Sequence, residues 1–257
     1  MTTHHRSNRS ELIGKKTHWQ ISDLGVIQQD HQYDPELLEV ICQKAVAIKE
    51  EVSAKRHLNL RYIRQAHVHI PEILELVYYP GRLDLLSTLA ETTLEPYPLS
   101  VIASTITFMG ATPDDGAIDW HADGVPVTEI IPLEIHDLTG GALQIYRGDY
   151  EVGLNKVHSG DTLADLVSIP HRIGASTLAQ LMRVLHRTEP ITTGHRISLN
   201  LNLRSRDKPY IDDNAAYYLA ADNPDYKWVD QYLDDVRARQ VPAYLAFQRH
   251  GSLHRAM

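Results

Sequence analysis

Three side chains that bind metals, those of His121, Asp123 and His186, are spaced as a single metal site would require. His121 and Asp123 stand two positions apart, so a strand would direct both side chains to the same face. His186 follows much later, so it must come from a distant strand that folds back beside the first. Two imidazoles and one carboxylate are the ligand set of a facial-triad Fe(II) site with open coordination positions. The spacing therefore predicts a non-haem iron centre.

A positively charged residue follows the second histidine, in a stretch with the alternation of a strand. Arg196 and Ser198 share one face of this stretch, and that face continues with Asn200 and Asn202. The opposite face is apolar and consists of Ile197, Leu199, Leu201 and Leu203. A strand that buries aliphatic side chains on one side and presents Arg, Ser and Asn on the other faces something polar.

The ordered set of His121-x-Asp123, distal His186 and Arg196-x-Ser198 resembles the motif of the Fe(II)/2-oxoglutarate-dependent dioxygenases, over about residues 100–206. The resemblance implies that the two histidines and the aspartate hold Fe(II) and form the catalytic centre. It implies 2-oxoglutarate and dioxygen as co-substrates, with the distal carboxylate of 2-oxoglutarate on Arg196 and Ser198, a contact that suits a guanidinium fork. The implied reaction is hydroxylation of an unactivated C–H bond in a small-molecule substrate.

The resemblance also implies finer assignments. Thr107 and Tyr146 are expected to line the barrel interior and to contact 2-oxoglutarate or substrate, although packing of Tyr146 in the core is an equal interpretation. The segments 120–125 and 140–146 are similar to those of small stand-alone enzymes that oxidise free amino acids or natural-product intermediates. Related halogenases replace the metal-binding carboxylate with Gly or Ala, so the retained Asp123 favours hydroxylation over halogenation.

Residues beside these candidates are assigned to other faces. Trp120 adjoins a metal ligand and His195 adjoins the arginine, so on a strand both should point the opposite way. Glu129 and Glu134 are interpreted as exposed strand charges. Trp228 is interpreted as the buried anchor of a C-terminal helix.

Other interpretations stay open. With 15 histidines in the chain, an H-x-D triplet can arise by chance, Asp123 and Gly124 can open a turn, and Arg196 can be a surface cation. A cupin-like isomerase or binding protein would use the metal without 2-oxoglutarate, and a non-catalytic interaction domain would carry a coincidental triad. Within the oxygenases, desaturation, epoxidation and ring closure use the same ligands as hydroxylation.

The chain changes character near Leu99. Before it helical patterns dominate, and Asp34-Pro35 marks the start of a helix that should run to about Lys55. After it come short alternating runs, expected to form strands over 100–109, 127–135, 142–147, 177–180, 183–187 and 196–204. The predicted fold class is mainly β with flanking α-helices, and the resemblance implies a double-stranded β-helix (jelly-roll) core.

One domain is predicted for residues 1–257. Residues 1–10 are polar and expected to be disordered, and 34–95 are expected to form a helical buttress. The β-helix core is assigned to 99–206 and a C-terminal helical region to 207–257.

Composition excludes several classes of protein. Of 257 residues, 43% are hydrophobic, which suffices for a substantial core. The single cysteine, Cys42, excludes an intramolecular disulfide and lies in an apolar helical pattern typical of a core residue. A net charge of −8 without a basic stripe argues against nucleic-acid binding. No apolar run reaches the length of a membrane span and the N-terminus lacks a signal-peptide pattern, so a cytoplasmic location is expected. No pattern indicates an oligomeric state.

Overall fold

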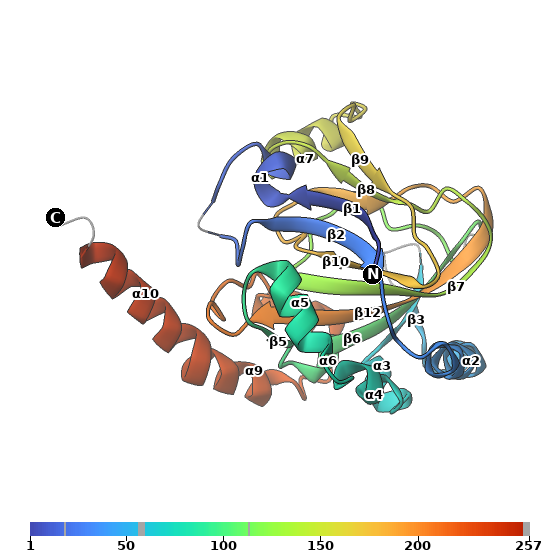
Figure 1. Cartoon of the computed structure of the whole chain (residues 1–257), viewed down its shortest axis with the longest axis horizontal. Coiled ribbons are helices and arrows are strands. Elements are labelled where there is room, and N and C mark those ends of the chain that lie inside the picture. Colours follow the sequence, from blue (N-terminus) through green and yellow to red (C-terminus); the bar gives the residue numbers. More distant parts are fainter. Residues whose placement is uncertain (18, 56–59, 113, 254–257) are drawn as a thin grey trace.

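A nine-stranded sheet and a three-stranded sheet form the centre of the protein, and helices cover the outside (Figure 1). The computed structural model describes residues 1–257 apart from 18, 56–59, 113 and 254–257. The prediction of a mainly β fold with flanking helices is confirmed.

The larger sheet joins strands from both halves of the chain. Its order is β1 (Thr3–Asn8), β2 (Leu24–Asp30), β10 (Ala175–Ala179), β7 (Val127–Thr139), β12 (Thr193–Ser205), β6 (Ser104–Gly110), β4 (Arg61–Arg64) and β3 (Ala54–Lys55), with β5 (Leu94–Pro96) paired to β12. The smaller sheet has the order β11 (His186–Thr188), β8 (Leu143–Tyr146) and β9 (Leu166–Ile169). The described pairings between neighbouring strands are antiparallel.

The helices fall into three groups along the chain. The first group comprises α1 (Arg9–Ile13), α2 (Pro35–Val52), α3 (Ala66–His69), α4 (Ile73–Val77), α5 (Arg82–Ala90) and α6 (Ser100–Ala103). α7 (Tyr150–His158) lies between β8 and β9. The last group comprises α8 (Ala216–Asp222), α9 (Val229–Asp235), a π-helical turn η1 (Val236–Gln240) and α10 (Val241–Leu253), and α10 projects from the rest of the molecule (Figure 1).

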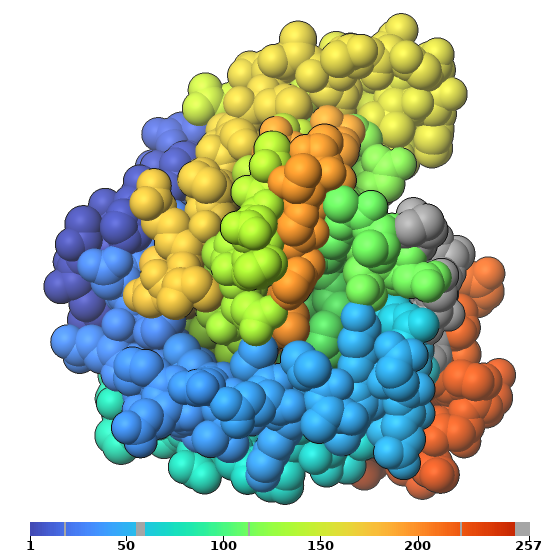
Figure 2. Space-filling view, turned by 90° about the vertical axis from the view of Figure 1, so that its right-hand side faces the viewer, coloured from blue at the N-terminus to red at the C-terminus, as the bar shows by residue number. Residues whose placement is uncertain are grey.

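The main hydrophobic core lies between α2 and one face of the larger sheet. α2 begins as predicted, because the Asp34 carboxylate accepts a hydrogen bond from the Glu36 N–H at 2.9 Å. Ile41 of α2 packs in one cluster with Ile131 of β7 and Leu199 of β12. Figure 2 shows the blue surface of the α2 region below chain segments that belong to the ends of β7 and β12, in yellow-green and orange. This core covers one face of the sheet and leaves the opposite face for a site.

The N-terminus is ordered, which corrects the prediction of disorder over residues 1–10. β1 pairs with β2, and α1 follows it directly. Arg9 is buried, and its guanidinium donates hydrogen bonds to the carbonyl oxygens of Gln180 and Met182 at 2.7 and 2.6 Å. The polar composition suggested disorder, but pairing with β2 satisfies the backbone hydrogen-bonding groups of this segment, and two carbonyl oxygens accept hydrogen bonds from the arginine.

The region 34–95 was predicted to be a helical buttress, but it is not purely helical. It also contributes β3, β4 and β5, and β4 lies beside β6 in the larger sheet. The strand expected from residue 100 begins only at Ser104, because Ser100–Ala103 form a helical turn. Val101 in this turn is buried in a cluster with Trp228, so tertiary packing overrides the β propensity of this segment. Trp228 is the buried helix anchor that the sequence predicted.

The described part of 207–257 is helical where it is regular. None of the helices in the described ranges is both long and apolar enough to cross a membrane.

Candidate active site

His121, Asp123 and His186, here called the triad, meet where the two sheets approach each other. His121 and His186 form an isolated antiparallel bridge, in which each backbone N–H donates to the other residue's carbonyl oxygen at 2.9 Å. The Asp123 N–H donates to the carbonyl of Leu181 at 3.3 Å, next to its bridge partner Met182. Backbone pairing thus brings the distant histidine beside the H-x-D segment, as the sequence predicted.

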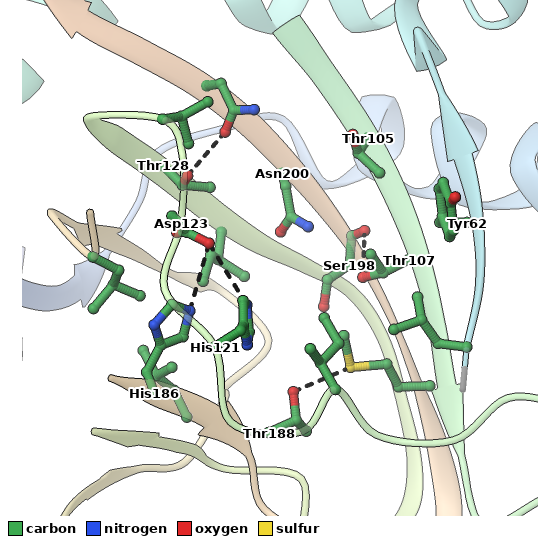
Figure 3. A pocket seen from close by; sticks show the side chains of 18 of the residues that line it. Tyr62, Thr105, Thr107, His121, Asp123, Thr128, His186, Thr188, Ser198 and Asn200 are labelled. Carbon is green, nitrogen blue, oxygen red and sulfur yellow. Dashed lines mark hydrogen bonds and ion pairs between the residues drawn. The ribbon is translucent and has the colours of Figure 1, made fainter. Parts of the chain in front are cut away.

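The donor atoms of the triad are spaced for one metal ion. The Asp123 Oδ1 lies 3.7 Å from the His121 Nε2 and 3.5 Å from the His186 Nε2 (Figure 3). One donor atom from each residue falls within 4.8 Å of the others. Donors that share an ion lie roughly 3–4 Å apart, because each metal–ligand bond is about 2.1 Å long. The arrangement fits a facial two-histidine, one-carboxylate site.

Backbone carbonyl groups set the orientation of both imidazole rings. The Nδ1–H of His121 faces the Asp119 carbonyl at 2.8 Å, and the Nδ1–H of His186 faces the Val184 carbonyl at 2.9 Å. A proton on Nδ1 leaves the Nε2 lone pair of each ring directed at the third ligand, which is the tautomer a metal needs.

The electrostatic surroundings shift the pKa values of His121 and Asp123. Burial, followed by the neighbouring His186, lowers the pKa of His121 to about 4, so this ring is neutral at physiological pH. For Asp123, burial acts to raise the pKa, but the two imidazoles outweigh burial and the pKa lies below its ordinary value. The site therefore offers a neutral imidazole at His121 and a carboxylate at Asp123.

Arg196 and Ser198 lie buried in the same cavity with unused hydrogen-bonding groups. Arg196 is 3% exposed, and its Nη2–H contacts the Met109 sulfur at 2.9 Å. Within the described residues, Arg196 Nε and Nη1 and the Ser198 hydroxyl have no hydrogen-bond partner. Desolvation lowers the pKa of Arg196 to about 9, which still leaves a cation at neutral pH. A sulfur atom is a weak acceptor, so this cation lacks the anionic partner that a buried charge requires.

The triad and this arginine line one cavity of about 270 Å³. Thr107 lines it as predicted, and its hydroxyl donates to the Ser198 carbonyl at 3.5 Å (Figure 3). Tyr146 does not line it: the ring packs with Leu163 and Leu185 on the other side of β8, which corrects the assignment of Tyr146 to the cofactor site.

Of the residues next to these candidates, His195 points as strand alternation predicted, whereas Glu129 differs from its prediction. The His195 ring points away from the cavity and bonds Glu134 at 2.6 Å. Glu129 is fully buried, which corrects its interpretation as an exposed charge. Its carboxylate accepts hydrogen bonds from Arg82 and from the Tyr33 hydroxyl inside the core.

Sequence reasoning missed the contribution of β4 to the cavity. Tyr62 and Arg64 of this strand line the cavity, together with Thr105 of β6. β4 is only four residues long and lies in a region dominated by helical patterns. The available signal was the aromatic and β-branched pair Tyr62-Ile63, which is too short to identify a strand without its partner.

Comparison with known proteins finds similar structures but no similar sequence family. No family model matches, and no curated protein matches. Among solved structures, the non-haem alpha-ketoglutarate-dependent carbocyclase SnoK from nogalamycin biosynthesis superposes with a TM-score of 0.55 at 17% identity, covering 71% of this chain and 80% of SnoK. The epimerase SnoN in complex with Fe³⁺, alpha-ketoglutarate and nogalamycin RO gives 0.52 at 15% identity, covering 71% and 80%. HygX from Streptomyces hygroscopicus, with nickel and 2-oxoglutarate bound, gives 0.53 at 10% identity, covering 70% and 83%.

These likenesses establish the fold. The chain has the fold of the iron- and 2-oxoglutarate-dependent oxygenases, so the resemblance seen in the sequence is confirmed at that level. The donor set of the triad fits iron.

Proposed function

We propose that this protein is a non-haem Fe(II)/2-oxoglutarate-dependent oxygenase that hydroxylates an unactivated C–H bond of a small molecule. One observation carries the proposal: a three-donor metal site and a buried, anion-free guanidinium line the same cavity. A cupin-like metal protein that does not use 2-oxoglutarate has no need for such a cation. With a dicarboxylate bound, the unused donors of Arg196 and Ser198 gain acceptors.

The protein's own residues supply ligation, orientation and exclusion of water. The triad would hold Fe(II) through His121 Nε2, Asp123 Oδ1 and His186 Nε2, and Arg196 and Ser198 would hold the distal carboxylate of 2-oxoglutarate. Fe(II) with 2-oxoglutarate supplies the dioxygen activation that amino-acid side chains lack. Apolar side chains of Ile118, Val125, Leu143 and Leu181 line the cavity and limit the entry of water.

The finer structural assignments belong to the same proposal. We assign residues 99–206 as a double-stranded β-helix and the whole of 1–257 as a single oxygenase domain. The bridges that join His121 to His186 of β11, and Asp123 to Met182, support a closed, jelly-roll arrangement of this kind. A cytoplasmic location stays a prediction.

Hydroxylation is the proposed outcome because the metal site retains its carboxylate. Ring closure and epimerisation, the activities named for SnoK and SnoN, are the alternatives within the same chemistry. Product analysis separates them, since hydroxylation adds one oxygen atom to the substrate whereas the other two outcomes do not. Free amino acids and natural-product intermediates are the first substrates to screen.

The first test is the visible difference spectrum of the purified protein with Fe(II) and 2-oxoglutarate under anaerobic conditions. We expect a weak charge-transfer band that appears only when both are present and is lost in His186→Ala. His195→Ala is the matched control, because its ring lies on the opposite strand face and should leave the band unchanged. Bound iron without a band would favour the cupin-like alternative, and the absence of bound iron would refute the metal site.

A further inference from the structure

A row of three side chains on neighbouring strands lies on the cavity face of the larger sheet, away from Arg196 and Ser198. Thr105 of β6 pairs with Arg64 of β4 on one side and with Asn200 of β12 on the other. Directly paired residues project to the same face with their Cβ atoms about 5 Å apart. All three line the cavity, and Figure 3 labels Thr105 and Asn200 among the lining residues.

The groups of this row are poorly satisfied by the protein itself. Arg64 uses one guanidinium nitrogen, Nη1, to donate to the neutral Asn223 side chain at 3.1 Å. Its guanidinium also lies 5.9 Å from the centre of the Tyr62 ring. Over the described ranges, Arg64 has no ion pair, and the side chains of Thr105 and Asn200 make no hydrogen bond. A guanidinium has five N–H donors, so most of the hydrogen-bonding capacity here is free for a ligand.

The charge of Arg64 is left over when the proposed cofactors are counted. Among the described residues that line the cavity, Asp123 carries the only carboxylate. Fe(II) and the 2-oxoglutarate dianion cancel each other, and Asp123 and Arg196 cancel as well. Arg187 also borders the cavity, but its guanidinium bonds Gln144 and lies 4.6 Å from the Trp120 ring centre. Arg64 and Arg187 therefore leave two positive charges around the loaded metal site, and that of Arg64 is the one that lies in this row.

The position of the row identifies it as a separate subsite. Asn200 lies four residues beyond Arg196 on β12, which corresponds to roughly 13 Å along the strand. One 2-oxoglutarate molecule on the metal cannot occupy both ends of this distance. The wall near the row is apolar, with Val101, Ile102 and Ile130.

We propose that Arg64, with Thr105 and Asn200, binds the carboxylate of the primary substrate, and that the substrate is a small monocarboxylic acid with an apolar body. This inference rests on the proposed oxygenase function and deepens it. One guanidinium with neutral donors matches a singly charged anion better than a phosphate dianion. The cavity of about 270 Å³ lies near the lower end of ligand pockets, which limits the size of the body that enters.

The test compares acids with their uncharged amides on the loaded enzyme. The protein is saturated with Fe(II) and 2-oxoglutarate without oxygen, and hexanoate, octanoate and phenylacetate are titrated by calorimetry against hexanamide, octanamide and phenylacetamide. We expect at least one acid to bind roughly tenfold more tightly than its amide. Arg64→Gln should raise the dissociation constant of that acid by about 10- to 100-fold and change that of its amide by no more than about twofold.

Two further variants separate recognition from structural support. Arg64→Lys keeps the charge and should retain a preference for the acid, even if loss of the Asn223 contact lowers stability. Arg61→Gln removes an arginine from the same strand whose partner is Glu50 at the surface, and it should bind the acid like wild type.

The subsite and the proposed function fail in different ways. A normal charge-transfer band with no acid preferred over its amide would overturn the subsite alone, as would an equal loss for acid and amide in Arg64→Gln. Absence of the band in the wild type would overturn the proposed function, and the subsite with it.

Discussion

Replacement of Arg196 by methionine should weaken 2-oxoglutarate binding without weakening the fold. Arg196 is buried against the Met109 sulfur, and no carboxylate among the described residues compensates its charge. Burial lowers the pKa of Arg196 to about 9, which disfavours the charged form by roughly 5 kcal/mol. An apolar side chain of similar length removes this cost, and such replacements are often neutral or stabilising by about 1–4 kcal/mol. The variant without ligand should therefore unfold at the wild-type temperature or above it.

The loss of ligand binding can be worked out from the same contact. Charged hydrogen bonds from the guanidinium to a carboxylate contribute about 1.5–3 kcal/mol, so the dissociation constant for 2-oxoglutarate should rise by about 10- to 100-fold. At 100 times the wild-type constant, the ligand stabilises the wild type by about 2.7 kcal/mol, or roughly 5–11 °C for a domain of this size. The same concentration should stabilise the variant by only about 0.4–1.4 kcal/mol, or roughly 1–6 °C.

The assay measures the unfolding temperature with Fe(II) under anaerobic conditions across a range of 2-oxoglutarate concentrations. 2-Oxopentanoate is the second ligand, because it keeps the 2-oxo acid group but lacks the distal carboxylate that Arg196 would contact. Wild type should prefer 2-oxoglutarate over 2-oxopentanoate, and Arg196→Met should bind the two nearly equally. Arg147→Met is the control, because Arg147 is exposed on the surface.

Three results would refute the reasoning. An unchanged affinity for 2-oxoglutarate in Arg196→Met would mean that another cation holds the co-substrate. An equal loss for both ligands would mean that Arg196 supports the site only through packing. A large drop in the unfolding temperature of the ligand-free variant would show that the buried guanidinium stabilises the fold.

Alanine at any triad position should reduce bound iron to background in metal analysis, while the unfolding temperature stays near that of wild type. The control His195→Ala should keep its iron. Iron retained in a triad variant would remove the substituted triad residue from the ligand set. Glu129→Leu should lower the free energy of unfolding in urea by about 3–5 kcal/mol, because it leaves Arg82 buried without its anion. Adding Arg82→Met should recover part of this loss, and no recovery would mean that the ion pair is not the cause. Burial raises the pKa of the Cys42 thiol to about 11, so the reactive thiolate forms only as the pH rises towards that value. Ellman's reagent should react with the folded protein at pH 8 far more slowly than with the urea-unfolded chain, and equal rates would contradict burial of the thiol.

The triad and the alternation of β12 were predictable because both depend on residue type and on a period of two. Ile197 and Leu199 pack in the core as the pattern required, while Arg196 and Ser198 line the cavity. The sequence also predicted α2 from its N-cap. These features are local, so a single segment contains the information that determines them.

β7 shows why the rest was not predictable. Pro132 lies in the middle of this central strand, where a proline would leave one hydrogen bond unmade. The register with β12 shifts beside it, since Ser198 pairs with Pro132 and Ile197 pairs with Glu134. The bulge changes which residues face the cavity, so Ile135 pairs with Arg196 although it is odd-numbered. Strict alternation along β7 misassigns every residue beyond the bulge, and only the partner strand reveals where it occurs.

The buried arginines support the interpretation of the cavity as a binding site for anions. Arg82 is paired with Glu129 in the core, and the buried Arg204 is paired with Glu95 and Asp235. Burial of an unpaired charge costs several kcal/mol, and this chain avoids that cost at both positions with a carboxylate. Arg196, as deeply buried, has only a sulfur atom as partner, and the three residues of the triad share its cavity. Arg64 and Arg187, neither of them paired with a carboxylate among the described residues, line the same cavity. The third buried arginine outside the cavity, Arg9, donates to two backbone carbonyl oxygens. Among the described residues, Arg196 thus differs from these three in having no oxygen acceptor, so its cavity is organised to receive an anion from a ligand.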